Sequence, residues 1–153
     1  MDLHLDQLLN QDHILLDLDV KDKDEAIDRL TEVLQDAPEV INITLLREDI
    51  RKRESEIPTG LENGAAMPHA RSKAVNNLIL AFARLKNGVD FGAQDGIPAS
   101  LIFEFGIPPD QISQYLKIIA KLSRFLKKRG VREKLLEASS PEEILETFAE
   151  REN

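Results

Sequence analysis

Residues 99–107 read ASLIFEFGI and residues 77–85 read NLILAFARL, so the chain carries two near-continuous apolar runs of strand length. Both runs are rich in Leu, Ile and Phe. Runs of this kind are typical of strands that are covered on both faces, which requires helices above and below a sheet. These two segments therefore predict the central strands of an α/β sandwich.

The segments on either side of these runs carry periodic patterns of their own. In HILLDLDV (13–20), apolar and polar residues alternate, which predicts a half-buried strand with His13 on the polar, solvent-facing side. Apolar residues at helical spacing predict helices over about 26–34 and 44–53, capped by Asp22 or Asp24 and by Asn42 or Thr44. In SSPEEILETF (139–148), Ser140 and Glu143 form the pattern of a capping box, with Pro141 at the first helical position.

A long amphipathic helix follows the second apolar run and ends near Gly130. Its apolar stripe consists of Ile112, Tyr115, Leu116, Ile119, Leu122, Phe125 and Leu126. Helices and strands thus alternate along the chain without an internal repeat or a linker. The sequence predicts one domain over residues 1–153, an α/β sandwich with helices on both faces of the sheet.

Composition excludes several classes of function. The chain has no cysteine, so it has no disulfide framework, thiol nucleophile or cysteine metal site. Its three histidines share no ligand spacing, which argues against a metal. The net charge of −8 argues against nucleic-acid binding. The acidic first residues do not resemble a signal peptide, and no apolar run approaches the ~18 residues of a membrane span. We therefore expect a cytoplasmic protein without direct membrane insertion.

Positive charge gathers in one segment of this acidic chain. Between Gln111 and Leu135 there are eight Lys or Arg residues and one acid, Glu133. Either this is a solvated helix face, or it is a docking patch for an acidic partner or a positive field near a phosphate.

The sequence GAAMPHAR (64–71) places His69 after four small or apolar residues and a proline. Pro68 holds the backbone before it extended, so we expect His69 where a short strand leaves the sheet. One interpretation is a loop histidine that packs against Met67 or binds a backbone carbonyl. The other is a reactive residue: no G-x-S-x-G elbow and no Gly-rich phosphate loop occurs, so the imidazole is the one plausible nucleophile.

The segment RESEIPTGLENGAAMPHARS (53–72) resembles the active-site signature of phosphotransferase-system (PTS) enzyme IIA domains of the fructose, mannitol and nitrogen-regulatory type. That signature reads approximately R-E-x-x-G-S-T-G-I-G-N-G-I-A-I-P-H. Eight positions match without a gap: Arg53, Glu54, Thr59, Gly60, Asn63, Gly64, Pro68 and His69. The elements on both sides are collinear with the family, so the resemblance implies its three-layer fold with a mixed central sheet.

The resemblance implies a phosphohistidine carrier, a transferase component without a cofactor. In the family the histidine at position 69 accepts a phosphoryl group from the phosphocarrier HPr and passes it to a IIB partner. Arg53 stands at the family arginine and can offer a bidentate fork to phosphate oxygens. The turns Thr59-Gly60 and Asn63-Gly64 can present backbone N–H groups as an anion-binding nest. The alternatives are a regulatory protein whose phosphorylation state is read by target proteins, and a scaffold that keeps the fold alone.

Three departures from the family pattern bear on this function. Ile57-Pro58 replaces a Gly-Ser pair, and Glu62 replaces a glycine and brings negative charge toward the expected phosphate. Tyr115 stands where many members carry a second histidine. Its ring either approaches His69 and binds the phosphate, or it is a core aromatic of the long helix.

Overall fold

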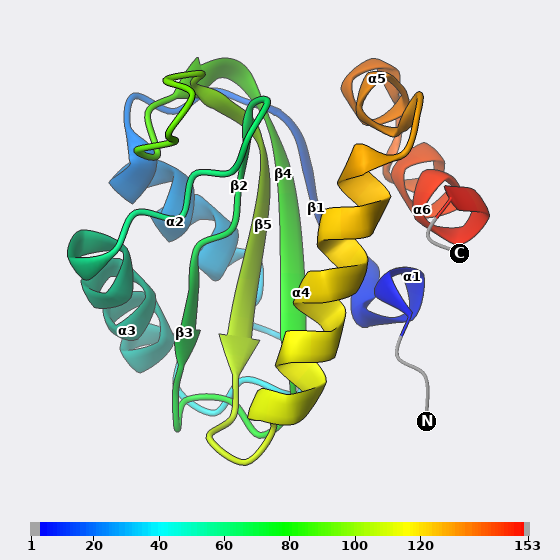
Figure 1. Ribbon diagram of the computed structural model, residues 1–153. Helices are drawn as coiled ribbons and strands as arrows, with labels where there is room; N and C mark the ends of the chain where they lie inside the picture. The colour runs from blue at the N-terminus through cyan, green and yellow to red at the C-terminus, as the bar shows by residue number, and fades with distance from the viewer. Residues whose placement is uncertain (1–3, 152–153) are drawn as a thin grey trace.

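The computed structural model describes residues 4–151. Figure 1 shows a twisted sheet between two layers of helices. Its strands are β1 (Leu9–Leu18), β2 (Ala65–Ala66), β3 (His69–Arg71), β4 (Ile79–Val89) and β5 (Ala99–Ile107). The strand order is β1-β4-β5-β2, and β3 also pairs with β5. Only the pair of β4 and β5 is antiparallel, so the sheet is mixed, and the predicted three-layer α/β fold is confirmed.

One face of the sheet is covered by α2 (Lys23–Glu32) and α3 (Ile43–Glu56). Each helix begins at a predicted cap: the side chain of Asp22 accepts from Glu25 N–H, and that of Asn42 accepts from Leu45 N–H. Small strand residues such as Ala81 and Ala83 face this layer. Because these side chains are short, the two helices can approach the sheet closely.

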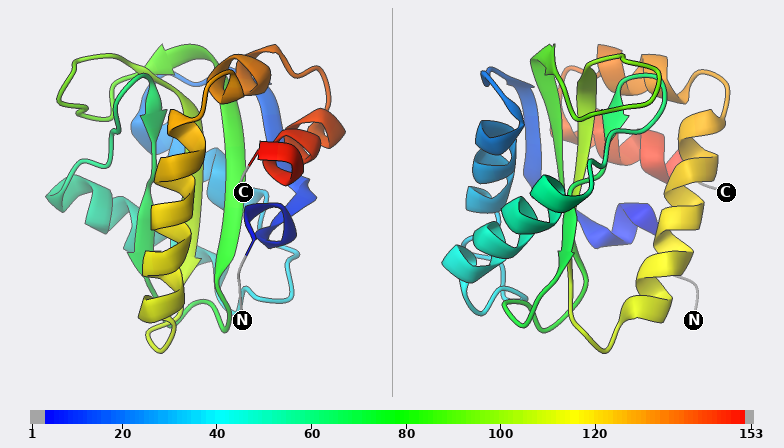
Figure 2. Two further views of the ribbon diagram at one scale, coloured as in Figure 1. Left: turned by 45° about the vertical axis from the view of Figure 1, so that its right-hand side comes forward. Right: turned by 60° about the vertical axis from the view of Figure 1, so that its left-hand side comes forward.

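The other face is covered by α1 (Leu5–Leu8), α4 (Ile112–Lys127), α5 (Val131–Glu137) and α6 (Pro141–Arg151), as Figure 2 shows from two sides. This half of the core contains six buried aromatic side chains, whereas Phe91 is the one aromatic residue of the other half among the described residues. Phe125 of α4 stacks on Phe148 of α6 at a centroid distance of 4.6 Å, and Phe148 meets Phe82 and Phe103 of the sheet edge-on. These contacts join the C-terminal helices to the central strands.

The predicted stripe of α4 is wrong at one position. Leu116 is 61% exposed, while Ile118, which the stripe omitted, is fully buried. The buried side of the helix is therefore centred on Tyr115, Ile118 and Leu122. Leu116 lies on the flank that borders the candidate site described below.

A backbone irregularity changes the predicted faces of β1. Asp17 has a positive φ of 54°, and the register of β1 against β4 shifts between Leu15 and Leu18. Ile14 consequently packs in the core on the face that α1 and α6 cover, whereas Leu18 packs in the core under α2 and α3. The simple alternation predicted for residues 13–20 is therefore wrong. His13, predicted at the surface, is buried.

Two charged residues of the central strands, Arg84 and Glu104, are buried. The guanidinium of Arg84 on β4 donates to the backbone carbonyls of Leu135, Leu136 and Ala138 at the end of α5, and it pairs with Asp17. Glu104 on β5 is fully buried, and one of its oxygens has no partner in the described part of the chain. Burial raises the pKa of Glu104 well above its ordinary value; the Thr31 hydroxyl opposes that shift, while Asp28 adds to it.

The helix α6 begins almost as predicted. Pro141 is its first residue, and Glu143 N–H donates to the hydroxyl of Ser140. The carboxylate of Glu143 accepts from the backbone and hydroxyl of Ser139 rather than from Ser140. Among residues 4–151, no helix is long and apolar enough to cross a membrane.

Candidate active site

His69 is the first residue of β3. The pairing with β5 is interrupted at Met67 and Pro68 and resumes in β3, so His69 begins a short strand, whereas the sequence placed it where a short strand leaves the sheet. Nδ1 of His69 lies 2.9 Å from the carbonyl oxygen of Met67. Because a carbonyl only accepts, Nδ1 carries the ring proton and donates it there. Nε2 of the neutral ring therefore keeps its lone pair.

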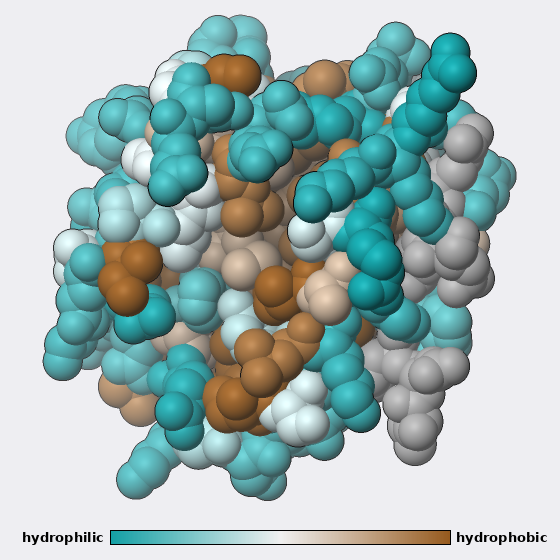
Figure 3. All heavy atoms as spheres, viewed as in Figure 1, coloured by the Kyte–Doolittle hydropathy of each residue, from teal (hydrophilic) through white to brown (hydrophobic). Residues whose placement is uncertain are grey.

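His69 lines a surface cavity of about 500 Å³ that is bounded by α3, β3 and α4. On the face drawn in Figure 3, the surface is hollowed between α3 and α4, and apolar side chains show there among polar ones. The histidine is half-buried, so a partner can reach its ring. Arg53 from α3 and Tyr115 from α4 line the same cavity. The structure thus brings together three of the seven residues predicted for the site.

Tyr115 contacts the histidine directly. The two ring centroids are 5.4 Å apart, and the planes are tilted by 32°. Burial raises the pKa of the Tyr115 hydroxyl well above its ordinary value, and the positive charge of Arg53 offsets part of that shift. The phenol is therefore neutral near pH 7 and can act as a hydrogen-bond donor.

The cavity carries more positive charge than the sequence indicated. Lys52 and Arg71 line it beside Arg53, together with the acids Asp49 and Glu56. Among the residues that the structure describes, the guanidinium of Arg53 forms no hydrogen bond or ion pair, so its donors are available to an anion. Sequence reasoning missed Lys52, although its place next to Arg53 near the end of α3 was a usable signal.

Thr59 does not line the cavity. Its hydroxyl and its backbone N–H both donate to the buried carboxylate of Glu54, which also pairs with Lys23 at 3.6 Å. The donors predicted to bind phosphate are thus used inside the protein. Glu54 instead fastens the loop of residues 57–64 to the end of α3.

The other turn residues are also engaged elsewhere. Gly60 N–H donates to the carbonyl of Phe91, and Asn63 N–H donates to Asp95. Gly64, with φ +82°, supports β5 through its carbonyl, which accepts from Ser100 and Leu101 N–H. The predicted nest is therefore wrong for Thr59, Gly60 and Asn63, whose N–H groups have internal acceptors.

Two of the three departures from the family pattern do not touch the histidine. Glu62 lines a separate small hollow between its loop and α4, where its carbonyl accepts from Arg132, so the negative charge expected near the phosphate does not line the His69 cavity. Pro58 packs so closely on Gly92 that a Cβ there would lie 2.7 Å from the proline.

The fold and the cavity together define a single α/β domain that presents one imidazole and the guanidinium groups of Arg53 and Arg71 at a sheet edge. A family model described as "Phosphoenolpyruvate-dependent sugar phosphotransferase system, EIIA 2" matches residues 7–151. The chain belongs to this family, whose members are phosphotransfer proteins.

Two curated relatives are fructose-specific components. The chain is 38% identical over 128 residues to the PTS system fructose-specific EIIA component of Haloferax volcanii, covering 84% of this chain and 83% of that protein. It is 34% identical over 144 residues to the PTS system fructose-specific EIIABC component of Bacillus subtilis, covering 94% of this chain. The chain spans 23% of the length of this second relative.

Solved structures include both regulatory and sugar-specific proteins. The nitrogen regulatory protein IIA-Ntr from Neisseria meningitidis is 30% identical, with a TM-score of 0.87 over 94% of this chain and 98% of that one. The enzyme IIAMTL in a complex with phosphorylated enzyme IIBMTL from Escherichia coli is 26% identical, with a TM-score of 0.79 over 94% of this chain and 100% of that one. A IIA domain of this fold thus pairs with a IIB domain in that complex.

Proposed function

We propose that this protein is the phosphoryl-carrier IIA component of a phosphoenolpyruvate-dependent phosphotransferase system. It accepts a phosphoryl group from phospho-HPr on Nε2 of His69 and passes it to a IIB partner. One observation carries the proposal: the Met67 carbonyl fixes the proton on Nδ1, so the free nitrogen is held ready in an accessible cavity that also contains Arg53.

In each step of the transfer, one bond to phosphorus breaks and one forms. In the first step the bond between phosphorus and the donor's histidine nitrogen breaks, and a bond between phosphorus and Nε2 of His69 forms. The donor nitrogen recovers its electron pair, and the Nδ1 proton of His69 stays on its hydrogen bond to Met67. In the second step the Nε2–phosphorus bond breaks, and a nucleophile on the IIB partner forms the new bond.

Arg53 and Tyr115 supply donors for this chemistry. Phosphoryl transfer spreads negative charge over the three equatorial oxygens of phosphorus, so fixed donors around those oxygens lower the barrier. The guanidinium of Arg53 can bind two of the oxygens at once. Tyr115 holds the His69 ring by packing and contributes a neutral hydroxyl.

Labelling tests the proposal. The protein is incubated with phosphoenolpyruvate, enzyme I and HPr from its own source, and the product is analysed by mass spectrometry and ³¹P NMR. We expect one acid-labile, base-stable phosphoryl group on Nε2 of His69. The variant His69→Ala should lose the label, whereas His4→Ala should keep it. Labelling that survives His69→Ala overturns the assignment.

A second stage separates transport from regulation. The phosphorylated protein is mixed with IIB domains from the same source, and loss of the label from His69 is followed. Rapid transfer to a IIB domain supports the carrier function. If no IIB domain takes the phosphoryl group, and a target protein binds one phosphorylation state alone, the regulatory alternative replaces the onward step.

A further inference from the structure

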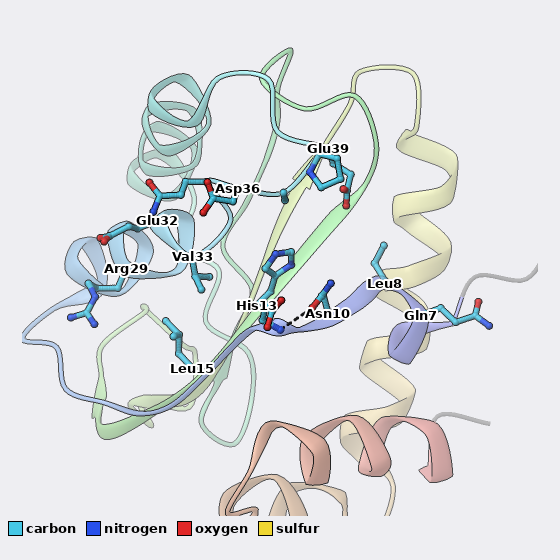
Figure 4. Close-up of a pocket in the computed structure, with 14 residues that line it drawn as sticks. Gln7, Leu8, Asn10, His13, Leu15, Arg29, Glu32, Val33, Asp36 and Glu39 are labelled. Carbon is cyan, nitrogen blue, oxygen red and sulfur yellow. Dashed lines mark hydrogen bonds between the residues drawn. The ribbon is translucent and has the colours of Figure 1, made fainter.

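A second and larger hollow lies at the sheet edge opposite to His69. It has a volume of about 720 Å³ and is bounded by β1, α1, α2 and the turn that follows α2. Figure 4 shows the side chains that line it. Pockets for small ligands typically measure ~300–1,000 Å³, so this hollow is large enough for one.

Unpaired negative charge lines this hollow. Its carboxylates are those of Asp12, Glu32, Asp36 and Glu39. Within residues 4–151 none of the four forms an ion pair, and Arg29 is the one cationic residue among the described lining residues. The local charge therefore favours a positively charged ligand.

His13 is the second observation that points to a ligand. Its side chain is 9% exposed, lines the hollow and forms no hydrogen bond to any residue in the described part of the chain. In Figure 4 its ring points into the hollow on the side of Glu39. Burial lowers the pKa of His13, against the opposing charges of Glu39 and Asp12, so the ring is mostly neutral at pH 7. Neither ring nitrogen of His13 is itself fully enclosed, so the neutral ring offers an unpaired acceptor to a ligand in the hollow.

Apolar side chains lie between the polar groups. Leu15 of β1 and Val33, just after α2, line the same hollow. The alkyl part of a ligand would be shielded from water by these two side chains. In the described residues no group of three or more His, Asp or Glu side chains is arranged to hold a metal ion, so the charge is suited to an organic cation.

We propose that this hollow binds a small organic cation that carries two protonated amines joined by a short alkyl chain. One ammonium donates to His13 and Glu39, and the other lies against Glu32 and Asp36. The methylene groups pack on Leu15 and Val33. This binding site is independent of the phosphoryl-transfer site at the other edge of the sheet.

An NMR titration of the full-length ¹⁵N-labelled protein tests the site. The probe is 1,4-diaminobutane, with 1-aminobutane, 1,4-butanediol and Mg²⁺ as comparison compounds at the same ionic strength. We expect saturable shifts of backbone amides around His13, Val33 and Glu39 with the diamine. The monoamine should bind about tenfold more weakly because one charge-assisted contact is lost. The diol and Mg²⁺ should leave these amides unchanged.

Two double variants each remove two carboxylates, one pair from this hollow and one pair from a different acidic hollow that serves as a control. Asp36→Asn with Glu39→Gln should weaken diamine binding about tenfold or more. Glu137→Gln with Glu146→Gln, which removes two carboxylates from an acidic hollow between α5 and α6, should leave it unchanged. His13→Leu should weaken binding, and His13→Gln, which restores an acceptor, should recover it.

Three results with the diamine, the variants and Mg²⁺ would overturn the proposal, and a fourth would come from a peptide. The first three are unsaturable shifts with the diamine, equal losses in the two charge-removal pairs, and identical shifts with Mg²⁺. Binding of a lysine-rich peptide without binding of the diamine would assign the surface to a protein partner instead, and it would equally refute the small-molecule site.

Discussion

The rings of His69 and Tyr115 are in contact at a centroid distance of 5.4 Å, although one belongs to an edge strand and the other to the first turn of α4. Tyr115 also meets Phe105 edge-on, and Phe105 is the residue that pairs with His69 across the sheet. Tyr115 is therefore both a core residue, 8% exposed, and a direct neighbour of the histidine. The structure thus shows both the ring contact with His69 and the core packing, while binding of a phosphate by the Tyr115 hydroxyl stays a prediction.

Substitution of Tyr115 can separate these two roles. Tyr115→Phe keeps the ring contacts, so we expect the free energy of unfolding to change by less than about 1 kcal/mol. The loss of one neutral hydrogen bond should shorten the lifetime of the phosphohistidine about two- to tenfold, measured by ³¹P NMR. Tyr115→Ala should lower the free energy of unfolding by about 3–5 kcal/mol, because it leaves a cavity against Phe105. An unchanged lifetime in Tyr115→Phe would mean that the hydroxyl does not reach the phosphate.

Arg53 should matter for the rate of transfer and little for folding. Arg53→Lys keeps the charge but loses the planar fork, so transfer from phospho-HPr should slow by ~10- to 1,000-fold. The side chain is exposed and has no ion pair among the described residues, so the melting temperature should stay nearly constant. Arg51→Lys on the same helix is the matched control, since Arg51 pairs with Asp24 and Asp28 and does not line the cavity. Equal rates in both variants would shift the role to Arg71 or Lys52.

Glu104 should make stability depend on pH. The Thr31 hydroxyl lies 2.9 Å from Glu104 Oε2 and 2.8 Å from the Ile27 carbonyl, and its single proton serves one of them, so a protonated Glu104 completes the network. Since burial raises its folded-state pKa, its contribution is present in full below the ordinary pKa of 4.5 and is lost as the pH rises through the folded value.

The variant Glu104→Gln removes this titration. We expect it to match the parent near pH 4.5 and to exceed the parent's free energy of unfolding at pH 9, measured by urea denaturation. The exposed residue Glu137 provides a control through Glu137→Gln, which should leave the pH profile unchanged. A parent-like profile in Glu104→Gln would show that the carboxyl is ionised in the folded protein.

Arg84 should hold the C-terminal helices to the sheet. Arg84→Met leaves three carbonyls at the end of α5 without their donor, so we expect a loss of about 3 kcal/mol in the free energy of unfolding. Hydrogen exchange should accelerate first in residues 131–150. Lys86→Met, an exposed change on the same strand, is the comparison. Uniform acceleration over the whole chain would indicate global destabilisation rather than release of these helices.

Local patterns predicted the elements of the fold well where the physical signal is itself local. The apolar runs at 77–85 and 99–107 became β4 and β5, and Asn42 and Pro141 begin their helices as expected. The faces of β1 were not predictable in this way. The positive φ of Asp17 reverses the alternation, and nothing in HILLDLDV marks that residue as left-handed.

The site was predicted in part for a similar reason. Contacts between segments that are distant in the sequence determine which hydrogen-bond donors remain available to a ligand. Thr59 and Asn63 looked available in the sequence, yet Glu54 and Asp95 occupy their N–H groups. The position of the proton on His69 depends on the backbone carbonyl of Met67. A sequence motif specifies side chains and does not show where a backbone carbonyl points.

The contact between α1 and α6 has an architectural consequence. Both helices pack beside β1, so the first and last helices of the fold lie together at one sheet edge. His69 lies three strand spacings away, about 14 Å at ~4.8 Å per strand. A linker joined to either helix would therefore start at the sheet edge opposite to His69. The same fold can be built into a longer polypeptide while the edge that carries His69 stays accessible to a partner protein.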